Sequence, residues 1–134
     1  VASGAGTALE ARNLSISTSN ASGYGAEVSQ RASMTLEAVT INTAGEDASV
    51  LYVRGAGSSL AFIDSHGTSA SYSGARLYGG KFSMLGGSLT AHEDAVFLGY
   101  DFDGVGSSAD IRDATLSSSN AMGSTSMATP PAPR

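Results

Sequence analysis

Two aspartates in the last third of the chain are the residues best placed to carry chemistry. Asp101 and Asp103 flank Phe102 and are followed by Gly104. Alternate residues of an extended segment project to the same side, so the two carboxylates could offer oxygens to Ca²⁺ or act as an acid–base pair. A calcium loop requires more oxygen ligands at fixed spacing, and the neighbouring sequence lacks them. We therefore predict no metal site and interpret the segment as a solvated turn, for which Asp-Gly is well suited.

An enzymatic role would need more than these two acids. Some polysaccharide lyases and hydrolases use clustered carboxylates, or carboxylates beside a Lys or Arg. Arg76 and Lys81 are the candidate cations, about one repeat before the aspartates. Acidic residues do not recur at equivalent places in the repeats described below. We therefore predict a protein that is not an enzyme and has no catalytic residues, with a carbohydrate-active lyase or hydrolase as the alternative.

Two further patterns could indicate a cofactor or a metal. The stretch GVGSSA from Gly104 to Ala109 matches a dinucleotide fingerprint in its spacing. That chemistry needs a helix after the glycines, whereas a strand-like ADI follows here. The two histidines, His66 and His92, fall at different places of the repeat and are not expected to meet. The sequence thus predicts no cofactor and no histidine-based metal site.

The tyrosines are the candidate binding residues. Each lies in or beside a strand-like segment that closes a repeat: Tyr24, Tyr52, Tyr72, Tyr78 and Tyr100. One interpretation is a partly exposed strip, since Tyr offers rigid amphipathic contact area. The other is an aromatic edge of the core, because aromatics pack well on β surfaces. Together with Asp101 and Asp103, the five tyrosines form the predicted binding surface.

Composition excludes several classes of partner. The net charge is -5 with only seven Lys and Arg, so no basic stripe is available for nucleic acid. No run of eighteen apolar residues occurs, so this segment is not expected to insert into a membrane. Cysteine is absent, which excludes disulfides and thiolate metal sites. Seventeen glycines and only three prolines, together with strand-like alternation, predict an all-β chain with many turns.

An internal repeat of about 25 residues positions these segments. The stretch GAGSSLAF (55–62) returns as GAGTALEA (4–11) and GVGSSADI (104–111), with weaker copies at 30–37 and 79–86. Its first apolar position gives the series Leu9, Met34, Leu60, Phe82 and Ala109. Its second gives the series Ala11, Leu36, Phe62, Met84 and Ile111. Residues two apart in a strand share a face, so both series are predicted to point inward.

Each repeat has about three strand-like segments and three turns. Hairpins favour two-residue Asn-Gly or Asp-Gly loops, and such a pair occurs here only at 103–104. Repeats in register instead favour about five coils of a parallel β-solenoid, stacked about 4.8 Å apart. In the closing segments Val28, Val53 and Tyr78 recur at the same interval and are predicted to stack. The third repeat departs from the pattern, with Ser65 and Gly67 in place of a second apolar pair.

The ends of such a rod expose unpaired strand edges. Edges of this kind favour self-association or contact with a neighbouring segment. We place the coils in residues 1–123 and interpret 124–134, which contains all three prolines, as a frayed tail or linker. The coils are expected to be a fragment of a longer solenoid.

These features resemble one protein family. The G-x-G-x-x-apolar-x-apolar copies, with LSISTSNASGYGAEV from Leu14 and VTINTAGEDASVLYV from Val39, are similar to coils of pertactin-like passenger domains of bacterial autotransporters. The resemblance spans residues 4–123. It implies an all-β, right-handed parallel β-helix, export to the bacterial cell surface or medium, and adhesion through a host protein or glycan. A passive stalk that spaces a distal binding tip is a further alternative.

Overall fold

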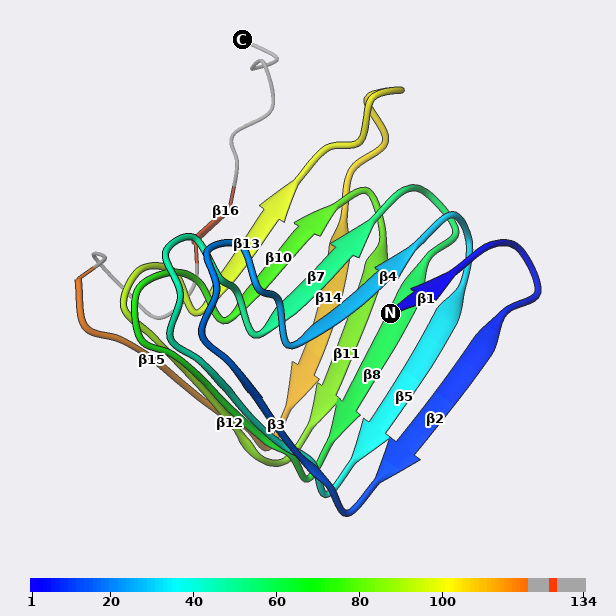
Figure 1. Cartoon of the computed structure of the whole chain (residues 1–134). Coiled ribbons are helices and arrows are strands. Elements are labelled where there is room, and N and C mark those ends of the chain that lie inside the picture. The colour runs from blue at the N-terminus through cyan, green and yellow to red at the C-terminus, as the bar shows by residue number, and fades with distance from the viewer. Residues whose placement is uncertain (121–125, 128–134) are drawn as a thin grey trace, which may run out of the picture.

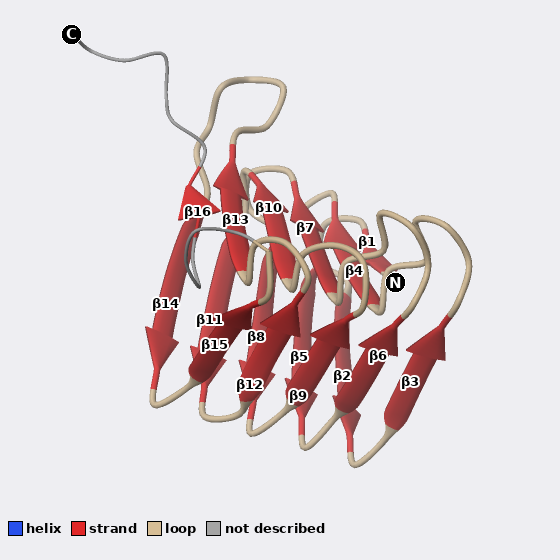
Figure 2. Cartoon of the chain, turned by 90° about the vertical axis from the view of Figure 1, so that its left-hand side faces the viewer, coloured by secondary structure: helices blue, strands red, loops and turns tan. Residues whose placement is uncertain are grey.

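The chain winds into a parallel β-solenoid of about five coils, as predicted (Figure 1). The computed structural model describes residues 1–120 and 126–127. Within these residues all named elements are strands, and none is a helix long and apolar enough to cross a membrane. Each coil contributes one strand to each of three parallel sheets, which form the three flanks of the solenoid (Figures 1 and 2).

The three sheets are named A, B and C. Sheet A contains β1 (Ala2–Ser3), β4 (Ala26–Ser29), β7 (Leu51–Arg54), β10 (Ala75–Tyr78), β13 (Val96–Gly99) and β16 (Ser126–Met127). Sheet B contains β2 (Ala8–Arg12), β5 (Ser33–Glu37), β8 (Ser59–Ile63), β11 (Lys81–Leu85) and β14 (Ser108–Arg112). Sheet C contains β3 (Ser15–Thr18), β6 (Thr40–Thr43), β9 (His66–Ser69), β12 (Ser88–Ala91) and β15 (Thr115–Ser118).

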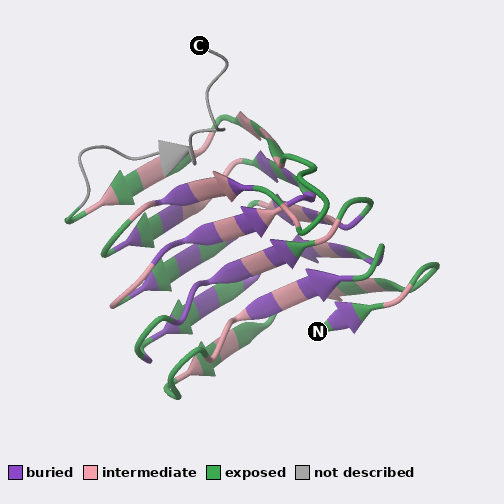
Figure 3. Cartoon of the chain, turned by 90° about the horizontal axis from the view of Figure 1, so that it is seen from above, coloured by how far each residue is buried: buried purple, intermediate pink, exposed green. Residues whose placement is uncertain are grey.

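The two predicted apolar series are confirmed as inward-facing columns of sheet B. In register, Leu9 pairs with Met34, Leu60, Phe82 and Ala109 in turn, and Ala11 with Leu36, Phe62, Met84 and Ile111. The members in the three middle coils are at most 3% exposed. Those in the first and last coils are only partly buried, because each has a neighbouring coil on one side alone (Figure 3). The core therefore depends on stacking, as expected for a solenoid.

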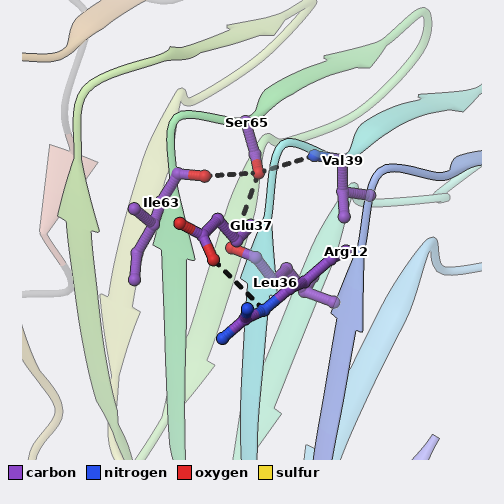
Figure 4. A network of polar contacts seen from close by, with 6 residues as sticks. All are labelled: Arg12, Leu36, Glu37, Val39, Ile63 and Ser65. Carbon is purple, nitrogen blue, oxygen red and sulfur yellow. Dashed lines mark hydrogen bonds and ion pairs between the residues drawn. The ribbon is translucent and has the colours of Figure 1, made fainter.

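The corner between sheets B and C explains why the third repeat lacks an apolar pair. Ser65 is fully buried; its hydroxyl donates to the carbonyl of Ile63 at 2.8 Å and accepts the backbone N–H of Val39 at 3.0 Å (Figure 4). Gly67 lies in the inward column between Ile41 and Leu89. A Cβ on Gly67 would lie 2.5 Å from Cγ1 of Val50, which fills the interior there.

The predicted stacking of the closing segments is wrong in one member. Val28 pairs with Val53, but Val53 pairs with Leu77, and Tyr78 pairs with Arg54 instead. The turn before β10 (70–74) is two residues shorter than the turn before β7 (44–50), whereas the corner before β8 (55–58) is one residue longer than that before β5 (30–32). The net interval is therefore 24 residues and not 25. A shift of one residue in a strand moves a side chain to the opposite face. Tyr78 therefore points outward and Leu77, fully buried, takes the core position.

The C-terminal part continues sheet A. Strand β16 pairs in parallel with β13, with Phe97 opposite Ser126 and Leu98 opposite Met127. The predicted boundary at 123–124 falls within 121–125, and most of the predicted tail falls within 128–134; both segments lie outside the described residues.

Candidate functional site

The outer face of sheet A carries the candidate site. Residues of its strands alternate between core and surface, so every second side chain points outward. One outward column contains Glu27, Tyr52, Arg76 and Phe97, which are paired in register. The adjacent column brings Arg54 beside Tyr78. These residues are half-buried or exposed, whereas the residues between them form the core.

An aromatic ladder runs along this face across successive coils. The rings of Tyr24 and Tyr52 are stacked, with centroids 4.5 Å apart and planes inclined by 14°. Tyr52 and Tyr78 meet edge to face at 5.7 Å, and Tyr78 and Phe97 do so at 5.8 Å. Offset-stacked and edge-to-face geometries are those that aromatic quadrupoles favour. None of these ring pairs is a register pair, since Tyr52 pairs with Arg76 and Tyr78 with Arg54. Strand spacing of about 4.8 Å instead lets rings of neighbouring coils meet diagonally.

Arg76 holds one end of the ladder in place. Its guanidinium carbon lies 4.1 Å from the ring centroid of Phe97 and 4.7 Å from that of Tyr72. Its Nε and Nη2 donate to the hydroxyl of Tyr78 at 3.1 and 2.7 Å, and its Nη1 donates to Ser73 Oγ at 3.1 Å. Cation–π contacts of this kind contribute about 0.5–2 kcal/mol each. The guanidinium is thus used within the protein.

A loop of eight residues, 100–107, replaces the short corner between sheets A and B in the last coil and projects beyond the solenoid (Figure 1). Asp101 organises it. Its Oδ1 accepts the backbone N–H groups of Asp103 at 2.9 Å and Val105 at 2.8 Å, and its backbone N–H donates to the carbonyl of Val105. Its Oδ2 accepts the N–H of Ala56 at 3.3 Å. The predicted solvated turn is therefore present, and the carboxylate is used to hold it.

The loop lies directly on a glycine of the preceding coil. Gly79 has φ +88, and a Cβ there would lie 2.6 Å from Cβ of Asp101. Ser107 ties the other side of the loop down: its hydroxyl accepts the N–H of Gly79 at 2.7 Å and donates to the carbonyl of Gly99 at 2.8 Å. Only a residue without a side chain allows this approach, so the glycine pair at 79–80 sets where the loop rests.

Between the loop and sheet A lies a groove of about 830 Å³. We call it the corner groove and define it by its lining residues: Ser29, Gln30, Arg31, Tyr52, Arg54, Gly55, Ala56, Tyr78, Tyr100, Asp101, Phe102 and Asp103. Phe102 is fully exposed at the loop, and Tyr100 is 37% exposed. Concave sites of this size that combine aromatic walls with a few polar groups are typical of ligand sites.

The charged groups of the corner groove differ in how far they are neutralised. Arg54 lies 3.7 Å from Glu27, and its side chain is 53% exposed. Arg31 is exposed, and no ion pair joins its guanidinium to any described residue. Its stem lies against Gly57, where a Cβ would come within 2.8 Å of Cγ of Arg31. Arg31 is thus held by its aliphatic part while its charged end remains available.

Two tyrosines of this face have perturbed acidity. Burial raises the pKa of Tyr52 above its ordinary value of 10.0, and the neighbouring Tyr24 raises it further, while Arg54 opposes the change. Burial also raises the pKa of Tyr72, against the lowering effect of Arg76. Both phenols are therefore neutral hydrogen-bonding groups at physiological pH.

The structure brings most of the predicted binding residues together. Tyr52, Tyr78, Tyr100, Asp101 and Asp103 all line the corner groove. Tyr24 stacks on Tyr52, and Tyr72 lies at the far end beside Arg76, so both extend the same face without lining the groove.

Among the lining residues that sequence reasoning did not predict, three carry a charge or an exposed ring. They are Arg31, Arg54 and Phe102. Both arginines lie in or next to a corner that opens a repeat. This shared position is the sequence feature from which they could have been predicted. Phe102 stands between two aspartates that had been chosen, and its exposure depends on the loop geometry.

The remaining candidate groups do not converge. His66 contacts Ser88 at 2.8 Å and His92 contacts Ser119 at 3.3 Å. Within residues 1–120 and 126–127, no three His, Cys, Asp or Glu side chains gather as a metal site would require. Lys81 points outward from sheet B, whereas Arg76 is used by the aromatic ladder. The two cations proposed for an enzymatic site therefore lie on different sheets, Arg76 on sheet A beside the groove residue Tyr78 and Lys81 on sheet B.

Searches of protein-family models, of curated proteins and of solved structures each return no match to this chain.

Proposed function

We propose that the chain is a non-enzymatic binding segment of a surface-displayed or secreted bacterial protein, of the kind seen in pertactin-like autotransporter passengers. In this proposal it contributes to adhesion by binding a host protein or glycan through the corner groove. The observation that carries the proposal is the corner groove itself, where three tyrosines and an exposed phenylalanine meet two arginines on the flank of a rigid solenoid. Tyr and Arg are the residues most enriched at binding hot spots.

The use of Asp101 supports binding rather than catalysis. Three backbone N–H groups occupy its carboxylate, which is the arrangement of a structural acid. Glycoside hydrolysis requires two free carboxyl groups facing one bond. Asp103 alone does not supply such a pair. An enzyme would be recognised by turnover of a polysaccharide that is lost in Asp103→Asn.

The open ends of the solenoid supply a second kind of contact. Leu9 and Ile16 in the first coil, and Ile111 and Leu116 in the last, are only partly covered. We propose that a neighbouring solenoid segment or a second copy covers them, since stacked coils bury this surface and pair the strand edges.

The proposal is tested by retention of the chain on host cells and on immobilised host glycoproteins. Phe102→Ala and Tyr52→Ala should each reduce binding by about tenfold or more, which is typical for hot-spot aromatics. Ser83→Ala, an exposed residue on sheet B, is the matched control and should bind as the wild type does. Equal binding by all three variants would reject the corner groove and favour a passive stalk.

A further inference from the structure

The charges and rings of the corner groove define a ligand class more closely than adhesion alone does. We propose that the corner groove binds an acidic saccharide, a sugar chain that carries a carboxylate or a sulfate group. This inference rests on the binding function proposed above. Three features carry it: the availability of the arginines, the arrangement of the rings, and the open shape of the groove.

The first feature is an anchored cation, Arg31, that forms no ion pair with any described residue. Arg31 follows Gln30, and both have φ in the left-handed region, at 65° and 54°. Its backbone N–H is fixed by Ser58 Oγ at 3.0 Å, and its aliphatic stem rests on Gly57. The corner therefore fixes the backbone and the aliphatic stem of Arg31 at the edge of the groove. A planar guanidinium can donate two parallel hydrogen bonds to a carboxylate or a sulfate.

A second arginine, Arg54, adds another positive group to the corner groove. Arg54 comes from the next corner along the solenoid, and its only ion pair among the described residues is the long contact with Glu27. The contact is long, and the Arg54 side of the pair is 53% exposed, so it contributes little to stability and leaves the guanidinium open to another anion. Two guanidinium groups from adjacent coils thus line one groove. The lining also holds Asp101 and Asp103, so the groove has two positive and two negative groups in a chain of net charge -5. Asp101 already accepts three backbone N–H groups, which leaves the two guanidinium groups alongside the carboxylate of Asp103.

The third feature is the kind of ring surface that the groove offers. The rings of Tyr52 and Tyr78 belong to the ladder and cannot turn freely, and Tyr100 adds a third ring from the loop. Fixed aromatic rings match the apolar C–H face of a pyranose, while the hydroxyl of Tyr52 and the carboxylate of Asp103 can bond to sugar hydroxyls. The site is an open groove beside an extended row of rings, which suits a chain rather than an enclosed small molecule.

The test compares two sugars that differ in charge. Binding of sialyllactose and of lactose to the full chain is measured by titration calorimetry, and a sulfated heparin oligosaccharide serves as the sulfate arm. The wild type should bind at least one acidic sugar about tenfold or more tightly than lactose. If only sialyllactose binds more tightly than lactose, the ligand carries a carboxylate. If only the heparin oligosaccharide does so, the ligand carries a sulfate.

Two variants test whether the preference for an acidic sugar arises in the corner groove. Arg31→Gln should abolish the preference for the acidic sugar, whereas Tyr100→Ala should weaken the binding of both sugars. Arg12→Gln removes an exposed arginine that pairs with Glu37 outside the groove, and it should behave as the wild type does. Retention of the preference in Arg31→Gln would overturn the inference.

The experiments distinguish an error in the acidic-saccharide inference from an error in the proposed binding function. If no sugar binds but Phe102→Ala still abolishes retention on host glycoproteins, the acidic-saccharide inference is wrong and the binding function stands. If neither sugars nor host glycoproteins depend on the groove variants, both proposals fail.

Discussion

Asp101 accepts a hydrogen bond at 3.3 Å from the backbone N–H of Ala56, a residue 45 positions earlier in the sequence. The contact spans the coil that contains Gly79, over which the side chain of Asp101 passes. One carboxylate thereby fixes the loop 100–107 to a corner two coils away. The groove wall formed by the loop is consequently part of the solenoid and not a free appendage.

Replacing Asp101 should release this loop without unfolding the protein. In Asp101→Ala the amides of Asp103 and Val105 lose their acceptor, and their hydrogen exchange should accelerate by about tenfold or more. The free energy of unfolding should fall by no more than about 1 kcal/mol, because the loop is exposed. Asp101→Asn keeps an oxygen acceptor at Oδ1, so both amides should exchange more slowly in this variant than in Asp101→Ala. If these two amides exchange at the same rate in Asp101→Ala as in the wild type, the other contacts of the loop are sufficient to keep it in place.

The apolar columns could be predicted from sequence because they repeat strictly with the coils. Every residue of the column that begins at Leu9 takes its expected register. Stacking imposes this regularity, since each inward side chain must meet its counterparts above and below. Constant spacing gave a wrong prediction for Tyr78. The strand is shifted there by one residue, which puts Leu77 in the core position and Tyr78 on the surface.

The candidate site was predictable only in its residue types. Asp101 and Asp103 could be chosen by their alternate spacing, and the tyrosines by their places in or beside the segments that close the repeats. The groove that joins them depends on a loop insertion, on the approach of that loop to Gly79, and on arginines of other coils. These are contacts between corners, and corners do not follow the periodicity of the strands. Phe102 therefore could not be found from the repeat alone, and the only sequence signal for Arg31 was its place at a corner that opens a repeat.

The buried hydroxyl of Ser65 should be important for stability. Ser65→Ala leaves the buried N–H of Val39 without an acceptor, which costs about 1–3 kcal/mol. Ser49 is the matched control, because its equally buried hydroxyl has no hydrogen-bond partner among the described residues. Ser49→Ala should be neutral or stabilising, since an unsatisfied polar atom is removed. Urea unfolding of both variants measures the difference, and equal losses would contradict the Ser65 network.

Gly67 and Val50 should be energetically coupled. A methyl group at Gly67 would collide with Val50, so Gly67→Ala should cost about 1–3 kcal/mol in spite of the reduced entropy of the unfolded chain. Val50→Ala removes the obstructing methyl groups and costs stability by itself. The double variant should lose clearly less than the sum, with a coupling energy of about 0.5–3 kcal/mol. Additive losses in thermal or urea unfolding would show that Val50 does not fill the space left by Gly67.

The acidity of Tyr52 predicts how stability changes in alkaline solution. Its pKa is raised in the folded protein, so the folded state retains the phenolic proton after the unfolded chain has lost it. The resulting stability is fully present below about pH 10, the pKa of an unperturbed tyrosine, and is lost as pH rises through the higher pKa of the folded state. The urea midpoint should therefore be level between about pH 8 and 9 and fall above about pH 10. Tyr52→Phe removes this ionisation and should flatten the fall. Identical alkaline profiles for the wild type and Tyr52→Phe would contradict the assignment of the burial effect to Tyr52.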